Sequence, residues 1–133
     1  MPINLTIDQG NTAAQMALWD GERLLDEAIE PHLTPEIVGR YVDAAPGPVD
    51  AALYCSVAER GAPVLDMLRA RAIRAVRLSA TSVRLPITIG YSSPHTLGAD
   101  RIAAAAGAWS LHPGSNLLVV DAGTAVTYDY VDS

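Results

Sequence analysis

Two short stretches that lie far apart decide the fold, namely Leu5-Thr6-Ile7-Asp8-Gln9-Gly10-Asn11-Thr12-Ala13 and Leu118-Val119-Val120-Asp121-Ala122-Gly123-Thr124-Ala125. Each is a strand-like apolar run that ends in aspartate, passes through a glycine turn and continues with Thr-Ala. Glycine lets the backbone approach phosphate oxygens closely, while turn amides and hydroxyls donate to them. A carboxylate at the strand end can hold a cation beside the same oxygens. One such turn is more often only a tight turn, whereas two copies predict a pair of phosphate-binding loops.

The first stretch opens an antiparallel meander. Residues 3–7 alternate between apolar and polar side chains, which is the periodicity of a strand. Residues 13–19 and 24–29 predict the next two strands, and Asp20-Gly21 between them is a hairpin signal. Three consecutive antiparallel strands are therefore expected.

Helices and strands alternate after residue 30. Thr34 and Pro35 predict an N-cap followed by proline in the first helical turn, and Pro63 opens a second helix. Residues 51–56 and 75–78 predict the strands that follow these helices, and such alternation is typical of parallel strands with crossover helices. An antiparallel meander followed by β-α-β-α predicts an α/β fold of the ribonuclease H-like type, the half-unit of actin-like ATPases and sugar kinases.

The second half of the chain begins with a long connection over residues 79–96, and long connections inside compact domains are often functional. Residues 97–111 predict a helix that is apolar on nearly every face, so we expect it to be covered on both sides. Residues 117–120 predict a buried strand and residues 125–131 another. We expect one domain over residues 1–115 and the first strands of a second, incomplete actin-like domain over 116–133.

Composition excludes several classes of function. The net charge is −6 and all basic residues are arginines, so neither a nucleic-acid surface nor a Walker A lysine is expected. The single cysteine, Cys55, cannot form an internal disulfide. Because neither a membrane span nor a signal peptide is indicated, we expect a cytoplasmic protein without membrane contact.

A second group of residues, Tyr91-Ser92-Ser93-Pro94-His95-Thr96-Leu97-Gly98-Ala99-Asp100-Arg101, runs from the long connection into the apolar helix. Asp100 falls in the first helical turn, where the helix dipole favours an ionised carboxylate. Such a carboxylate can accept a proton from a substrate hydroxyl, and Arg101 can bind a substrate carboxylate through two parallel hydrogen bonds. The alternatives are that both side chains are only solvated, or that Arg101 pairs within the protein and positions the helix.

Together, Asp8-Gln9-Gly10-Asn11-Thr12, Gly98-Ala99-Asp100-Arg101 and Asp121-Ala122-Gly123-Thr124 resemble, in order and spacing, the three motifs of type III pantothenate kinases. The resemblance implies transfer of the γ-phosphoryl of ATP to pantothenate, the first step of coenzyme A synthesis. It also implies a homodimer that shares the pantothenate pocket across its interface. In that family an aliphatic residue is expected where this chain has Gln9.

The same resemblance assigns roles to individual residues. It implies that Asp100 is the proton acceptor and that Asp121 binds K+ or NH4+, while ATP carries a divalent cation, Mg2+. It implies pantothenate contacts from Tyr91, Gly98, Ala99, Asp100 and Arg101. It implies ATP contacts from Asp8, Gln9, Gly10, Asn11, Thr12, Ala13, Ala14, Gln15 and Thr124.

Few residues follow Asp121, so we expect a fragment that lacks most of the adenine site and has little activity alone. Two other functions stay open at this point. One is a non-catalytic regulatory or dimerisation module of the same family, and the other is an actin-like kinase that acts on a sugar or on acetate. The Gly98–Arg101 motif argues against the second.

Overall fold

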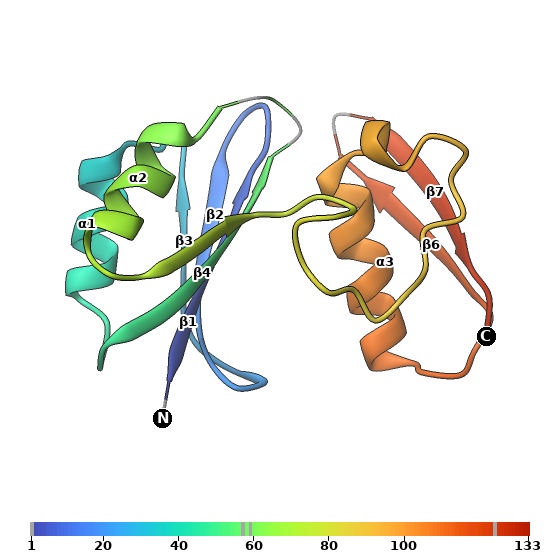
Figure 1. Ribbon diagram of the computed structural model, residues 1–133, viewed down its shortest axis with the longest axis horizontal. Coiled ribbons are helices and arrows are strands. Elements are labelled where there is room, and N and C mark those ends of the chain that lie inside the picture. The colour runs from blue at the N-terminus through green and yellow to red at the C-terminus, as the bar shows by residue number, and fades with distance from the viewer. Residues whose placement is uncertain (1, 57, 59, 124) are drawn as a thin grey trace. The chain divides into compact units, whose positions relative to one another are not determined.

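The computed structural model describes residues 2–56, 58, 60–123 and 125–133. The chain forms two compact units, residues 1–77 and residues 78–133 (Figure 1). These units are groups of residues in mutual contact, and they do not test the predicted domain boundary between residues 115 and 116. That boundary stays a prediction. Among the described residues, no helix is long and apolar enough to cross a membrane.

The first unit is built on a five-stranded sheet in the order β3-β2-β1-β4-β5. Strands β1 (Ile3–Gln9), β2 (Ala14–Asp20) and β3 (Arg23–Glu30) form the predicted antiparallel meander. Strands β4 (Val49–Ser56) and β5 (Arg74–Arg77) extend the sheet in parallel on the other side of β1. This is the ribonuclease H-like, actin-type half-unit that the sequence predicted.

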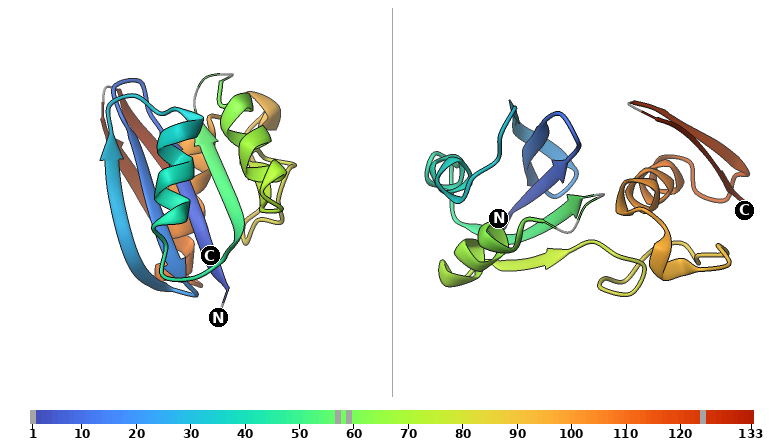
Figure 2. Two further views of the ribbon diagram at one scale, coloured as in Figure 1. Left: turned by 90° about the vertical axis from the view of Figure 1, so that its left-hand side faces the viewer. Right: turned by 90° about the horizontal axis from the view of Figure 1, so that it is seen from above.

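Helices α1 (Pro35–Asp43) and α2 (Ala62–Ala70) lie on the same face of this sheet (Figure 2). The predicted N-cap is confirmed, because the Thr34 hydroxyl accepts a hydrogen bond of 3.2 Å from the amide of Ile37. The hydrophobic core lies between the helices and the sheet. Its buried side chains include Leu5, Ile7, Tyr54, Val38 and Leu68.

The second unit contains a long connection with a short 3-10 helix (Pro94–Thr96), then helix α3 (Ala99–Leu111) and the antiparallel hairpin of β6 (Leu117–Ala122) and β7 (Val126–Val131). Helix α3 packs against the hairpin through both strands. The predicted helix and both predicted strands are therefore confirmed in position.

The expected burial of this unit is wrong in two places. Helix α3 buries only Ala99, Ile102 and Ala105 among its residues, although it is apolar on most of its surface. Strand β6 was predicted to be buried, yet Leu118 is 67% exposed. The physical reason is that α3 covers one face of the hairpin, while the described residues of this unit place no second layer on the other face. That outer face carries Leu118, Val120, Val126, Tyr128 and Tyr130, all exposed.

Candidate functional site

The first predicted phosphate turn connects β1 to β2. Its backbone is closed by a hydrogen bond of 2.9 Å from the Gly10 amide to the Ala13 carbonyl. Residues 9–14 line a cavity of about 190 Å³ together with Arg60 and residues 31–33. Of the predicted ATP contacts, the structure thus brings together Gln9, Gly10, Asn11, Thr12, Ala13 and Ala14.

The remaining two residues of the predicted phosphate segment lie elsewhere. Asp8 and Gln15 are directly paired across β1 and β2 and line a separate hollow of about 200 Å³ with Trp19 and Glu27. Successive side chains of a strand point to opposite faces, which is why Asp8 and Gln9 separate although they are neighbours. The carboxylate of Asp8 therefore does not line the same cavity as the turn residues that follow it.

A buried tyrosine on the neighbouring strand contacts the start of the turn between β1 and β2. Tyr54 on β4 is fully buried, and its hydroxyl donates a hydrogen bond to Oε1 of Gln9. The guanidinium of Arg77 lies 5.1 Å from the centre of the same ring. A buried tyrosine hydroxyl requires an acceptor, which explains why a glutamine stands where an aliphatic residue was expected.

Arg60 is a residue at this turn that the sequence analysis missed. Its guanidinium donates to the Gly10 carbonyl, and its own carbonyl accepts from Arg77. It therefore places a positive charge beside the predicted phosphate turn in a chain that has no lysine. No sequence signal could have found it, because Arg60 and Gly10 are separated by 50 positions and by three strands and a helix.

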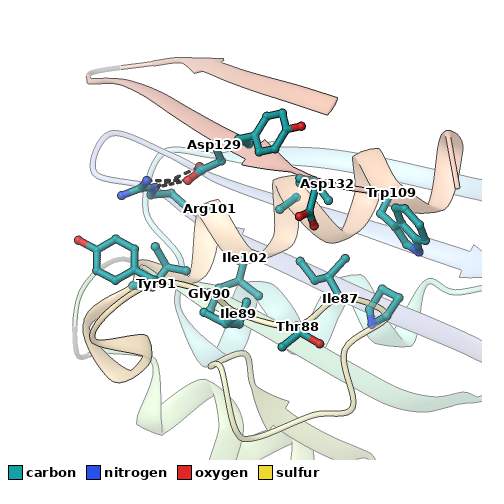
Figure 3. Close-up of a pocket in the computed structure, with 15 residues that line it drawn as sticks. Ile87, Thr88, Ile89, Gly90, Tyr91, Arg101, Ile102, Trp109, Asp129 and Asp132 are labelled. Carbon is teal, nitrogen blue, oxygen red and sulfur yellow. Dashed lines mark hydrogen bonds and ion pairs between the residues drawn. The ribbon is translucent and has the colours of Figure 1, made fainter. Parts of the chain in front are cut away.

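The second unit contains a larger cavity of about 540 Å³ (Figure 3). Residues 86–91 of the long connection form one part of its wall, and β7 with the following Asp132 forms another. Helix α3 contributes Arg101, Ile102, Ala105 and Trp109. The cavity is thus lined by two of the predicted substrate contacts, Tyr91 and Arg101, and also by Trp109.

Arg101 is paired with a carboxylate from β7. Its Nη2 donates to Oδ1 of Asp129 over 2.6 Å, and its Nε donates to Oδ2 over 3.1 Å. The hydrogen bond to Asp129 raises the pKa of Arg101, against the opposing effect of burial. The internal pairing that the sequence left open is therefore present, and its partner Asp129 was missed.

Asp100 lies in the first turn of α3, as predicted, whereas Ala99 is buried beside it. Neither Gly98, Ala99 nor Asp100 is among the residues that line the cavity. Gly98 is the N-cap, and a Cβ atom at this position would lie only 2.7 Å from Oδ1 of Asp100. The missing side chain of Gly98 therefore makes room for the Asp100 carboxylate itself.

We expect Gly98→Ala to displace the Asp100 carboxylate. With Asp100 as the proton acceptor that the resemblance implies, the turnover of the whole protein should fall by about tenfold to a hundredfold, since a shift of about 1 Å in a reacting group can cost that much. Gly107→Ala is the matched control, because a Cβ there meets nothing within 4 Å. Steady-state kinetics of both variants check this. Equal turnover in the two variants would show that the position of the carboxylate does not matter.

The second predicted phosphate turn connects β6 to β7. The Gly123 amide donates to the Ala125 carbonyl over 3.0 Å, which corresponds to the bond from Gly10 to Ala13 in the first turn. The predicted ATP contact Thr124 lies outside the described residues. The two similar sequence segments thus each form a turn in which the glycine amide donates to the carbonyl of the following alanine.

Asp121, the predicted cation ligand, is an exposed carboxylate at the end of β6 and is paired with Thr127 on β7. In the described part of the chain, no three side chains of His, Cys, Asp or Glu come together as a metal site. Oxygen ligands from carboxylates and carbonyls suit hard cations. Asp121 can therefore supply one such oxygen ligand at the turn.

Comparison with known proteins places these features in a family. The model of the type III pantothenate kinase family matches residues 4–133. A type III pantothenate kinase from Porphyromonas gingivalis is 35% identical over 133 residues, which cover 100% of this chain and 53% of that protein. One from Azobacteroides pseudotrichonymphae is 35% identical over 130 residues, or 96% of this chain and 51% of that protein.

A shorter match is more similar. A type III pantothenate kinase from Cytophaga hutchinsonii is 56% identical over 50 residues, which cover 38% of this chain and 21% of that protein. The chain spans about half the length of the curated relatives that it matches over its whole length. The family model nevertheless covers both glycine turns and the Gly98–Arg101 motif. The chain therefore belongs to the type III pantothenate kinase family.

Proposed function

We propose that the whole protein is a pantothenate kinase, which transfers the γ-phosphoryl of ATP to pantothenate in the first step of coenzyme A biosynthesis. The observation that carries this proposal is the family match over residues 4–133. It is supported by the cavity of the second unit, where Tyr91 and Arg101 of the predicted substrate motif line one hollow.

In the proposed reaction, the hydroxyl oxygen of pantothenate attacks the γ-phosphorus as the bond to the ADP oxygen breaks. The hydroxyl proton passes to the Asp100 carboxylate, which lies in the first turn of α3. Arg101 binds the substrate carboxylate, with Tyr91 beside it. Phosphoryl transfer of this kind depends on positioning and on charge stabilisation rather than on covalent chemistry of the protein.

ATP binding is proposed for the segment Asp8 to Gln15 and for Thr124. The turn amides, the Thr12 hydroxyl and the nearby guanidinium of Arg60 are the groups of the first unit that would meet its phosphates. Mg2+ bound with ATP and K+ or NH4+ at Asp121 would neutralise phosphate charge. We further propose that the protein is a cytoplasmic homodimer that shares the pantothenate pocket between its subunits. Sedimentation of the whole protein tests whether it is a dimer.

A substrate panel tests the proposed function. The whole protein is incubated with ATP, Mg2+ and K+, and ADP release is measured with pantothenate, with a set of sugars and with acetate. We expect release only with pantothenate. ADP release with a sugar or acetate instead would identify another actin-like kinase, and a thermal shift with pantothenate but no ADP release would indicate a non-catalytic binding module.

A further inference from the structure

We propose that Asp129 is a positioning residue for substrate binding: it holds the guanidinium of Arg101 so that one edge stays available for the carboxylate of the substrate. This inference rests on the proposed function. It concerns a residue outside the three motifs from which the family was recognised.

Asp129 occupies one of the two hydrogen-bonding edges of the Arg101 guanidinium. A guanidinium presents five N–H groups in a fixed plane. Asp129 accepts from Nε and from Nη2, so it occupies the side edge of that plane. The end edge, formed by Nη1 and the second N–H of Nη2, has no acceptor among the described residues. Two parallel N–H groups of this kind match a carboxylate.

An aromatic ring lies near the same guanidinium. The Arg101 guanidinium lies 5.7 Å from the centre of the Tyr91 ring, within the range of a cation–π contact. Figure 3 shows Tyr91 and Asp129 near the end of the Arg101 side chain, with dashed lines to the carboxylate. Tyr91 and Asp129 thus restrict a side chain that would otherwise sample many rotamers. All three residues line the cavity.

Asp129 lies on the less exposed side of β7. Its side chains alternate so that Thr127, Asp129 and Val131 are the less exposed set, while Val126, Tyr128 and Tyr130 are exposed. A carboxylate on the covered side of a strand is costly unless it is paired. The Asp129 side chain is 19% exposed and the Arg101 side chain is 28% exposed, so the pair is largely withdrawn from water. A role in holding Arg101 explains why a carboxylate stands on the less exposed side of β7.

A structural role alone would be that the pair fastens β7 to α3. The two roles predict different kinetics. If Asp129 only fastens the elements, its loss lowers stability, and the smaller folded fraction lowers the apparent kcat without changing the KM for pantothenate. If it positions Arg101, its loss raises the KM for pantothenate, leaves kcat nearly unchanged, and has no further effect once Arg101 is absent.

A double-mutant cycle in the whole protein tests this. We expect Asp129→Ala and Arg101→Ala each to raise the KM for pantothenate by about tenfold or more. A change of this size corresponds to an interaction energy within the range that is measured for coupled pairs of residues. We expect kcat to stay within about threefold, since only interactions that strengthen in the transition state change it. The double variant should have the KM of Arg101→Ala alone. Asp129→Asn, which keeps one acceptor oxygen and the same shape, should lie between wild type and Asp129→Ala.

The control is Asp43→Ala, which removes an ion pair of similar length, 2.8 Å between Asp43 and Arg71, from the first unit. It should leave the KM for pantothenate unchanged.

Two outcomes would overturn the proposal. One is additive effects of the two substitutions in the cycle. The other is a lower KM for pantothenate in Asp129→Ala, which would mean that Asp129 only weakens the attraction of Arg101 for the substrate. If Asp129→Ala does not fold, Asp129→Asn carries the same test against Arg101→Ala. An active wild type with an additive cycle overturns this inference alone, whereas a wild type without pantothenate turnover overturns the proposed function and this inference with it.

Discussion

Asp100→Asn should lower kcat for pantothenate phosphorylation by about two to four orders of magnitude, the usual contribution of a general base. Asparagine has nearly the same shape as aspartate but cannot accept the hydroxyl proton. Because the amide still fits beside Gly98, the KM for pantothenate should change little. Steady-state kinetics of the whole protein, with ADP release coupled to a dehydrogenase, measures both constants.

The control for this variant is Asp66→Asn. Asp66 lies on α2 of the first unit, is 77% exposed and makes only a long ion pair of 3.9 Å with Arg69, so its loss should leave kcat unchanged. A kcat of Asp100→Asn within a few-fold of wild type would contradict the role of Asp100 as proton acceptor. A large rise in KM at constant kcat would assign Asp100 to substrate binding instead.

Gly61→Ala should destabilise the first unit by about 2–5 kcal/mol. Gly61 has φ of +98°, a conformation that costs an L-residue about 1–2 kcal/mol. A Cβ atom there would also overlap the Tyr54 ring, with Cε1 only 2.6 Å away. Tyr54 is fully buried and cannot move aside, and overpacking of this kind costs about 1–3 kcal/mol. Urea denaturation followed by circular dichroism measures the loss.

Gly21→Ala is the matched control for this substitution. Gly21 also has positive φ, +60°, but a Cβ there meets nothing within 4 Å. It should therefore show the backbone cost without the steric overlap. Equal losses of unfolding free energy in the two variants would mean that Tyr54 does not pack tightly behind the predicted phosphate turn.

Much of the fold could be predicted because local physical chemistry determines it. The alternation of residues 3–7, the Thr34 cap and the helix-opening prolines each act within a few residues of the element that they define. The order of these elements then permitted few topologies. For the same reason the Asp-x-Gly turns were found in the sequence, since their glycine-to-alanine hydrogen bonds are local.

The supporting contacts could not be predicted in this way. Asp129 lies 28 positions from Arg101, and Tyr54 lies 45 positions from Gln9. Such pairs form only when distant strands and helices pack, and their spacing follows no period. The exposure of β6 was missed for a related reason, because an apolar run shows that a strand can be buried but not what covers it.

The most direct measurement of the central claim is transfer of label from ATP to substrate. The whole protein is incubated with pantothenate and ATP that is labelled in the γ-phosphoryl group, and the products are separated by chromatography. Our account predicts label in phosphorylated pantothenate, with the Asp100→Asn variant forming almost none. Label that stays in ATP, or appears in inorganic phosphate at the same rate with and without pantothenate, would contradict it.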